Sequence, residues 1–286
     1  MGEYKYFVST DWLKEHLKDE DLFVIDSRFD LFDPANYGHK AYAEGHIEGA
    51  YYFDIDEDIT EDKGAHGGRR GTPDAAVLGA KLAAIGVNMD SVIVCYDDTV
   101  YSASRTWWQL RYMGYENVCV LNGGYQEWCE KGYPVSREVP ASRGQGTFEE
   151  NKRGEMFACK NCIVAAIKDP DAHIIVDSRG PQRYSGEVEP LYSKRGHIPG
   201  AINIHYLTNM KDGSVLNLIG TPEQWKANFA PCLEKEDAIL YCGSAIEAAV
   251  NFMFLSEIGY APRLYVGSMS DWVTYDDLEV EASYEQ

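Results

Sequence analysis

The stretch Phe23-Val-Ile-Asp-Ser-Arg28 returns later in the chain as Ile174-Ile-Val-Asp-Ser-Arg179, at an offset of 151 residues. A second motif, Gly45-His-Ile-Glu-Gly-Ala50, returns at the same offset as Gly196-His-Ile-Pro-Gly-Ala201. Two motifs that recur in one order and at one spacing indicate an internal duplication, which sets the frame for every other feature of the sequence.

Two further motifs extend the duplication toward the end of each copy. Tyr96-Asp97 corresponds to Tyr241-Cys242 at an offset of 145, and Leu121-Asn-Gly-Gly-Tyr-Gln-Glu-Trp128 corresponds to Tyr265-Val-Gly-Ser-Met-Ser-Asp-Trp272 at 144. The smaller offset indicates that the second copy lost about six residues between its histidine and its cysteine. Four motifs in one order leave little room for coincidence.

The duplication divides the chain into two domains. Its 286 residues suffice for two domains that each bury a core of their own. Residues 138–155 combine proline, glycine and many charges with no apolar periodicity, so we interpret them as a linker. The sequence therefore predicts an N-terminal domain over residues 1–137 and a C-terminal domain over residues 156–286.

Within each copy, short apolar runs alternate with amphipathic segments. The run Leu22–Ile25 predicts a buried strand, and a helix is expected over residues 104–113. The second copy repeats this order with a strand at Ala238–Tyr241 and a helix over Ile246–Ile258. Strands that are continuously apolar and alternate with helices predict an α/β fold, with two tandem parallel sheets flanked by helices.

Composition and charge limit the classes of partner. The net charge of −20 argues against nucleic acid and against anionic membrane surfaces, and no apolar run is long enough to span a membrane. An anionic substrate would need a local positive pocket to outweigh this field. The N-terminal residues lack the apolar region of a signal peptide, and an odd number of cysteines, seven, indicates reduced thiols. We therefore expect a cytoplasmic protein.

Cys242 differs from the other cysteines in its place along the chain. It ends a predicted buried strand and opens Cys242-Gly-Ser-Ala-Ile-Glu247, just before a predicted helix. A short loop at that point can turn successive N–H groups toward one atom, and the helix N-terminus adds positive potential. We expect this environment to lower the thiol pKa and make Cys242 nucleophilic. We interpret Cys95, Cys119 and Cys129 as structural thiols and assign Cys232 no role.

The order of these motifs resembles that of the two-domain rhodanese and 3-mercaptopyruvate sulfurtransferase family. The motifs are Asp-Ser-Arg, Gly-His-Ile-x-Gly-Ala, a strand–cysteine loop–helix unit and Gly-(Ser/Gly)-x-x-x-Trp. The resemblance extends from about Val8 to Trp272. In that family the N-terminal domain is catalytically silent and has Asp where the second domain has the nucleophilic Cys, as Asp97 and Cys242 stand here. The resemblance implies two rhodanese-like domains, of which the second is catalytic.

The resemblance also implies a two-step sulfur transfer. Cys242 would take a sulfane sulfur from a small anionic donor, 3-mercaptopyruvate or thiosulfate, and pass it from the persulfide to cyanide, a thiol or a thioredoxin-like acceptor. Mercaptopyruvate is slightly favoured, because Gly243-Ser244-Ala245 is similar to the Gly-Ser-Gly of mercaptopyruvate enzymes. The alternatives are a thiosulfate sulfurtransferase proper and a non-catalytic persulfide-binding module. No cofactor or metal is expected.

The resemblance further assigns site residues. Ser244 together with Asp56 and His66 is similar to the Ser-His-Asp set that mercaptopyruvate enzymes are thought to use for proton handling. Arg183 matches the arginine that anchors the donor, since a guanidinium fork suits a carboxylate or sulfonate. The predicted site therefore consists of catalytic and donor-binding residues: Cys242, Ser244, His66 and Asp56, and Arg183, Gly243, Ala245, Ile246 and Glu247.

Two positions depart from the family pattern. Mercaptopyruvate enzymes usually carry a second arginine nine residues after the first, where this chain has Tyr192. Glu247 stands where the family often has Thr. A carboxylate beside the sulfur should raise the thiol pKa or repel an anionic donor, unless it points away into solvent. The sequence leaves both interpretations of Glu247 open.

Other motifs have competing interpretations. A cysteine-based phosphatase is excluded, because it needs Arg six residues after the nucleophile and position 248 is Ala. Cys159-Lys-Asn-Cys162 has the spacing of a redox dithiol, but it aligns with an ordinary helix start in the first copy, and we interpret it as structural. The repeated residues of the two copies, Arg28 and Arg179 with His46 and His197, are also interpreted as structural.

Overall fold

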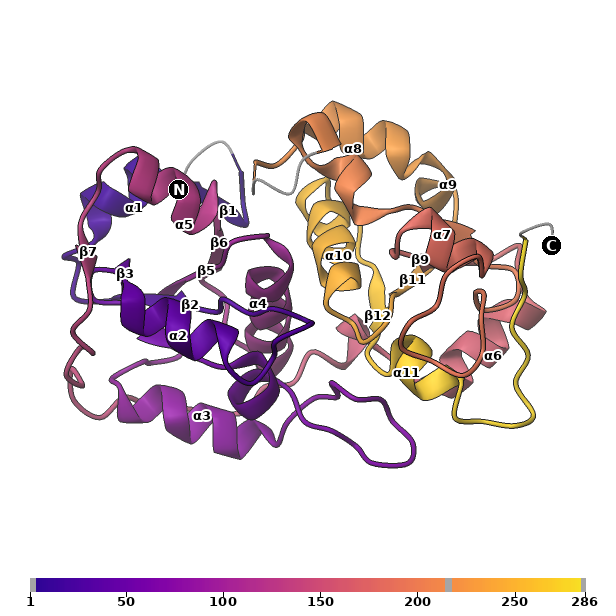
Figure 1. Ribbon diagram of the computed structural model, residues 1–286, viewed down its shortest axis with the longest axis horizontal. Coiled ribbons are helices and arrows are strands. Elements are labelled where there is room, and N and C mark those ends of the chain that lie inside the picture. The colour runs from indigo at the N-terminus through magenta and orange to yellow at the C-terminus, as the bar shows by residue number, and fades with distance from the viewer. Residues whose placement is uncertain (1–3, 214–217, 284–286) are drawn as a thin grey trace. The chain divides into compact units, whose positions relative to one another are not determined.

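In the computed structural model the chain forms two compact units (Figure 1). The structure describes residues 4–213 and 218–283. Of these, residues 4–61, 72–153 and 218–219 form the first unit, and residues 62–71, 154–213 and 220–283 form the second. The short segment 62–71, although it comes from the first copy, therefore belongs to the second unit.

The first unit is built on a five-stranded parallel sheet. In spatial order its strands are β1 (Phe7–Ser9), β6 (Val118–Asn122), β5 (Val92–Tyr96), β2 (Leu22–Asp26) and β4 (Tyr51–Tyr52). Two short strands, β3 (His46–Ile47) and β7 (Val135–Ser136), pair antiparallel beside it. The helices are α1 (Thr10–His16), α2 (Tyr37–Glu44), the π-helix η1 (Ile55–Ile59), α3 (Ala75–Ala84), α4 (Tyr101–Met113) and α5 (Gly124–Glu130).

The second unit has a parallel sheet of the same size. Its strands in spatial order are β10 (Ile202–Asn203), β9 (His173–Asp177), β11 (Asp237–Tyr241), β12 (Arg263–Tyr265) and β8 (Phe157–Ala158). Its α-helices are α6 (Lys160–Lys168), α7 (Pro181–Ser185), α8 (Pro222–Asn228), α9 (Ala230–Leu233), α10 (Glu247–Glu257) and α11 (Ser268–Trp272). Three 3₁₀ turns complete it: η2 (Gly154–Met156), η3 (Tyr206–Asn209) and η4 (Lys211–Gly213).

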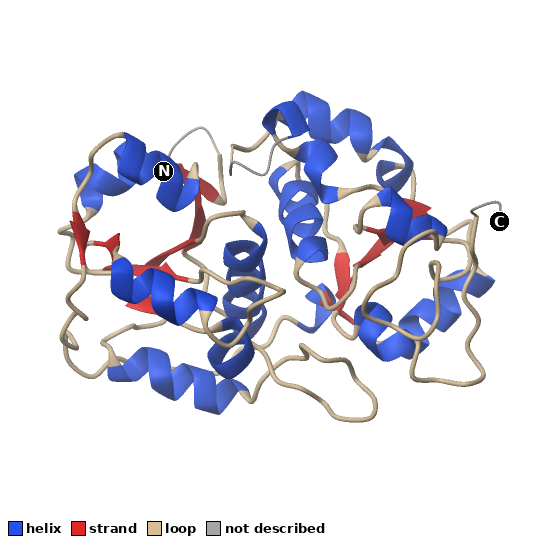
Figure 2. Ribbon diagram, in the orientation of Figure 1, coloured by secondary structure: helices blue, strands red, loops and turns tan. Residues whose placement is uncertain are grey.

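The two sheets have the same topology, and the strand order given for the second sheet runs from the opposite edge. Strand β2 corresponds to β9, β5 to β11 and β6 to β12, with β1 and β8 at one edge and β4 and β10 at the other. Figure 2 shows that in each unit the strands lie inside and the helices lie around them. The predicted α/β class with two tandem parallel sheets is confirmed, and the duplication in the sequence is a duplication of structure.

Both faces of each sheet are buried, as continuously apolar strands require. In β2, Leu22 and Val24 join the core formed with α1 and α5, while Phe23 and Ile25, which point to the opposite face, are equally buried. The helices begin and end close to the predicted limits: the helix expected over residues 104–113 is α4, and the one expected over 246–258 is α10.

The repeated Asp-Ser-Arg and Gly-His-Ile motifs form the same contacts in both units. Arg28 forms an ion pair with Asp26 and donates to the carbonyl of Gly45 at 2.7 Å, and Arg179 forms the corresponding pair and donates to Gly196. His46 stacks on Tyr42 and His197 on Tyr184, and the Nδ1 atom of each lies within 3 Å of that tyrosine's carbonyl oxygen. These residues therefore join segments of the fold, in keeping with the structural interpretation.

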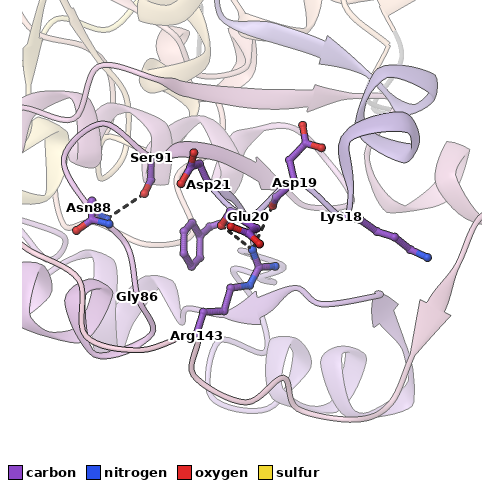
Figure 3. A pocket seen from close by; sticks show the side chains of 9 residues that line it. Lys18, Asp19, Glu20, Asp21, Gly86, Asn88, Ser91 and Arg143 are labelled. Atoms are coloured by element: carbon purple, nitrogen blue, oxygen red, sulfur yellow. Dashed lines mark hydrogen bonds between the residues drawn. The ribbon is translucent and has the colours of Figure 1, made fainter.

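Most of the segment predicted as a linker packs on the first unit. Arg143 donates to the carbonyl of Leu22 at 2.7 Å, and its guanidinium lies 4.8 Å from the centre of the Phe23 ring. Figure 3 shows Arg143 in a pocket together with Asp19 and Glu20. The pocket around it is lined by acidic side chains, among them Asp19 and Glu20, and contains no cysteine. Within the described residues, no helix combines the length and the apolar character needed to cross a bilayer.

Candidate active site

Cys242 lies at the carboxyl end of the central strand β11, where ligands of parallel α/β sheets bind. The loop that follows turns back at Ala245, which has a left-handed backbone with φ of 61°. Ser268 holds the loop in place, because its hydroxyl oxygen accepts from the N–H groups of Cys242 at 3.2 Å and of Ala245 at 3.1 Å. The Gly243 carbonyl accepts from the N–H of Ser270 at 2.9 Å and closes the same turn.

The loop directs N–H groups at the sulfur of Cys242. The N–H groups of Ser244 and Ala248 both form hydrogen bonds with the thiol and favour its ionised form. The expected cradle of N–H groups therefore exists. It is the arrangement that stabilises a developing anion in acyl-transfer sites, here aimed at sulfur.

The expectation of a lowered pKa for the Cys242 thiol was wrong. Burial, with Cys242 only 1% exposed, and the neighbouring Glu247 carboxylate raise the pKa of the thiol to about 11, although the two N–H groups oppose this shift. Desolvation of a thiolate next to a second anion outweighs the attraction of the loop. The resting thiol therefore keeps its proton at neutral pH.

Glu247 is the first residue of α10, and its carboxylate forms a hydrogen bond with the Cys242 thiol. Burial raises the pKa of Glu247 to about 7, and Asp177 adds to this, whereas the cations Arg183 and Arg179 oppose it. Of the two interpretations left open by the sequence, the hydrogen bond to the thiol favours a side chain that faces Cys242, since Glu247 is only partly exposed and does not simply point away into solvent.

Arg183 reaches the loop from α7. A β-carbon placed on Gly243 would lie 3.5 Å from Arg183 Nη1, so the guanidinium stands next to the loop backbone. Glu189 is fully buried and binds Arg183 through both carboxylate oxygens, at 2.9 and 3.0 Å, while it also accepts from Arg179 at 3.1 Å. Tyr192 donates to the Gly243 carbonyl at 2.9 Å in place of the family's second arginine.

The predicted Ser-His-Asp set draws its residues from both units. The Ser244 hydroxyl accepts from Arg70, a residue only 2% exposed, at 3.1 Å. His66 is exposed; its Nδ1 bonds the Thr274 hydroxyl at 2.7 Å, and its ring stacks on Tyr275 rather than meeting Ser244. Asp56 lies in the π-helix η1 of the first unit. A proton-handling role for His66 and Asp56 stays a prediction.

Three residues of the site were missed by the sequence analysis. Arg70 is separated from Ser244 by 174 residues, Ser268 is the first residue of α11 and lies 26 residues after Cys242, and Glu189 is one of many acidic residues in the sequence. Only the buried ion pair distinguishes Glu189, and no local pattern signals it. The remaining predicted loop residue, Ile246, is almost fully buried beside the cysteine.

Two cations lie near the cysteine loop, although Arg183 is also paired with Glu189. Arg70 donates to the Ser244 hydroxyl, and Arg183 lies next to Gly243. Both cations belong to a protein whose net charge is −20. Among the described residues there is no group of three or more His, Cys, Asp or Glu side chains suited to a metal ion.

The fold and the cysteine loop define a class of protein, and comparison with known families agrees. The sequence profile of the rhodanese-like domain matches residues 9–131 and again residues 161–275. The chain therefore belongs to the rhodanese family, with two tandem copies of the domain.

Its relatives narrow the class to one kind of enzyme. The chain is 36% identical over 271 residues to a protein of Pseudomonas aeruginosa named "Probable 3-mercaptopyruvate sulfurtransferase", covering 92% of this chain and 93% of the relative. It is 29% identical to "Thiosulfate/3-mercaptopyruvate sulfurtransferase 1, mitochondrial" of Arabidopsis thaliana, covering 96% and 78%. The crystal structure of SseA, a 3-mercaptopyruvate enzyme of Escherichia coli, matches with a TM-score of 0.80 at 29% identity, covering 93% and 99%. The protein is a sulfurtransferase.

Proposed function

We propose that the protein transfers sulfur from 3-mercaptopyruvate through a persulfide on Cys242 to a thiophilic acceptor. The observation that carries this is the loop itself, in which the N–H groups of Ser244 and Ala248 converge on the sulfur of Cys242. A persulfide is more acidic than a thiol and extends one atom further. The same N–H groups would therefore hold its anion more strongly than they hold the resting thiol.

The charges around Cys242 support mercaptopyruvate over thiosulfate as the donor. Arg183 offers one guanidinium, already shared with Glu189, which suits a single carboxylate better than a dianion. Glu247 beside the sulfur adds negative charge next to the reacting atom, and repels a dianion more than a monoanion. Tyr192 supplies a neutral hydroxyl where a second arginine would have added charge.

Glu247 is proposed as the group that takes the Cys242 proton. The ionised carboxylate accepts the thiol proton, and the thiolate attacks the sulfur of mercaptopyruvate. The donor's carbon–sulfur bond breaks and pyruvate leaves as its enolate, whose carbon then takes the proton back from Glu247. Cys242 keeps the donor's S–H as a persulfide, so every atom and electron pair is accounted for. Ser244, His66 and Asp56 form the alternative proton-handling set.

The acceptor is proposed to be a small thiol, cyanide or a thioredoxin-like dithiol, because the terminal persulfide sulfur reacts with thiophiles. All seven cysteines are free thiols, which supports a reducing compartment such as the cytoplasm. The alternatives are a thiosulfate enzyme proper and a non-catalytic persulfide carrier.

The decisive experiment measures sulfur transfer from mercaptopyruvate and from thiosulfate side by side, with Cys242→Ser as the control. We expect faster turnover with mercaptopyruvate and none in the variant. Preference for thiosulfate would replace the proposed donor. A persulfide that forms on Cys242 but is passed to no acceptor would favour the carrier.

A further inference from the structure

Cys159 and Cys162 form a pair of thiols in the second unit, apart from Cys242. Their sulfur atoms lie 3.3 Å apart, in contact, with Cys159 exposed and Cys162 half-buried. Cys159 caps α6, a helix of nine residues, and Cys162 lies in its first turn. A disulfide between residues of this spacing needs only a small side-chain rotation, because the two sulfurs already face each other.

Helix capping alone does not account for a cysteine at this position. In the first copy the corresponding cap is Ser9, whose hydroxyl oxygen accepts from the N–H of Trp12 at 3.1 Å. Serine is among the preferred capping residues, whereas sulfur is a weak hydrogen-bond acceptor. The second copy thus has a poorer cap and places a second thiol against it.

The surroundings favour the thiolate of Cys159. Although partial burial opposes ionisation, hydrogen bonds from the Cys162 side chain and from the N–H groups of Cys162 and Asn161 lower the pKa of Cys159. On the other side, the Arg263 guanidinium forms a hydrogen bond with Cys162. An exposed thiol with a lowered pKa beside a second thiol is the arrangement of an attacking and a resolving cysteine.

The register of the sheet places this pair on the same edge as Cys242. Leu240 lies opposite Leu264 across β11 and β12, and Leu264 lies opposite Phe157 across β12 and β8. Cys242 and Cys159 each follow that row by two residues, so both stand just beyond the carboxyl ends of their strands. With one strand between them, their Cα atoms are roughly 10 Å apart.

We propose that Cys159 and Cys162 form a reversible dithiol switch that low-molecular-weight persulfides oxidise to a disulfide. The Cys159 thiolate attacks the sulfane sulfur of the persulfide, the persulfide S–S bond breaks and the small thiol leaves. The Cys162 thiolate, after losing its proton to water, then attacks Cys159 Sγ and expels hydrogen sulfide. Two thiols and one persulfide give one disulfide, one thiol and one hydrogen sulfide, and the sulfane sulfur takes up the two electrons.

The switch does not depend on the proposed function, since neither step uses Cys242. The disulfide would form when sulfane sulfur accumulates, one strand away from Cys242, which is proposed to carry that sulfur. A small dithiol would reverse it.

The test uses the reduced full-length Cys242→Ser protein, so that catalysis cannot supply or remove sulfur. Glutathione persulfide is added, free thiols are blocked, and peptides are mapped by mass spectrometry while released hydrogen sulfide is measured. We expect a Cys159–Cys162 disulfide, one hydrogen sulfide for each disulfide, and reversal by dithiothreitol. Cys129, exposed on α5, is the matched control and should react severalfold more slowly.

Single variants separate the two steps. Cys162→Ser should stop at a persulfide on Cys159 and release no hydrogen sulfide, whereas Cys159→Ser, which restores the cap of the first copy, should form neither product. The proposal is overturned if the pair stays reduced while Cys129 reacts, or if Cys159 keeps its persulfide with Cys162 intact.

Discussion

The loops that follow β5 and β11 turn at corresponding residues but hold different chemical groups. Both turn at a non-glycine residue with positive φ, Val100 at 67° and Ala245 at 61°. In the first loop the Asp97 carboxylate accepts from the N–H groups of Val100 at 2.6 Å and of Ser102 at 2.8 Å. In the second loop the corresponding atom is the thiol of Cys242. The first cradle holds a carboxylate and the second holds a thiol.

This difference supports the proposal that only the second copy is active. The cradle of the first loop is filled by its own side chain, so that no exchangeable group remains at the end of β5. Burial disfavours a charge in the first loop as well. It raises the pKa of Asp97 to about 6, although hydrogen bonds to the carboxylate oppose this shift. Glu247 corresponds to Ser102, whose hydroxyl donates to Asp97 at 2.6 Å. The second loop thus has a carboxylate where the first has a hydroxyl donor.

The largest expected effect comes from making the second loop like the first. Cys242→Asp should abolish turnover, by more than about a thousandfold, because the cradle would hold a carboxylate that cannot carry sulfur. Circular dichroism and thermal melting should remain close to wild type. The reverse exchange, Asp97→Cys in the Cys242→Asp background, should not restore activity, because Phe32 stands where the second copy has Arg183. Restored turnover would show that the two loops are interchangeable.

The next effect concerns the stability of the silent loop. The pKa of Asp97 lies above its unfolded value of 3.8, so the folded state binds more protons between pH 4 and 6, and stability falls as pH rises through that range. Relative to Asp97→Asn, wild type should lose about 2 kcal/mol between pH 4 and 6 and about 3 kcal/mol over the whole titration, the equivalent of about two pKa units. Urea denaturation followed by tryptophan fluorescence, to which Trp107 and Trp108 of the adjoining helix α4 contribute, measures the difference between the two proteins.

A control residue sharpens this measurement. Asp11 is exposed and its pKa is lowered, chiefly by the hydroxyl of Tyr133, so Asp11→Asn should change the pH dependence in the opposite direction. If Asp97→Asn leaves the wild-type pH dependence intact, Asp97 is not the group that titrates.

The fold was predictable from the sequence because its signals are local and repeated. Apolar strands, helix limits and the place of Cys242 follow from patterns within a few residues of one another. The pKa of Cys242 was predicted in the wrong direction, because burial and the approach of Glu247 depend on packing. Arg70, Ser268 and Glu189 act across 174, 26 and 6 residues, respectively, on Ser244, Cys242 and Arg183, and only the folded chain brings them there.

The third prediction tests Glu247 as the proton acceptor. In wild type the kcat/KM for mercaptopyruvate should rise with pH around a midpoint near 7, as the carboxylate ionises. Glu247→Gln should lack this rise and be about tenfold slower at pH 8, equivalent to about 1.4 kcal/mol. We expect only this modest loss of rate, because removing the negative charge of Glu247 also makes the Cys242 thiol easier to ionise.

His66→Gln distinguishes the alternative proton-handling set in the same assay. Because His66 bonds Thr274 rather than Ser244, this variant should keep the wild-type pH profile. A faster Glu247→Gln enzyme at every pH would mean that Glu247 only repels the donor, and a lost rise in His66→Gln would assign proton handling to the alternative set.

The smallest expected effect lies in the backbone that the two loops share. A left-handed residue costs about 1–2 kcal/mol, which glycine would relieve, but Ala245→Gly also loses about 0.8 kcal/mol of methyl burial and up to about 1 kcal/mol of chain entropy. The changes cancel, so its melting temperature and turnover should stay near wild type. Val100→Gly removes two more buried carbons and should lose about 2 kcal/mol in total. Equal losses of stability in both variants would show that the left-handed residue costs a different amount in each loop, despite the matching φ values.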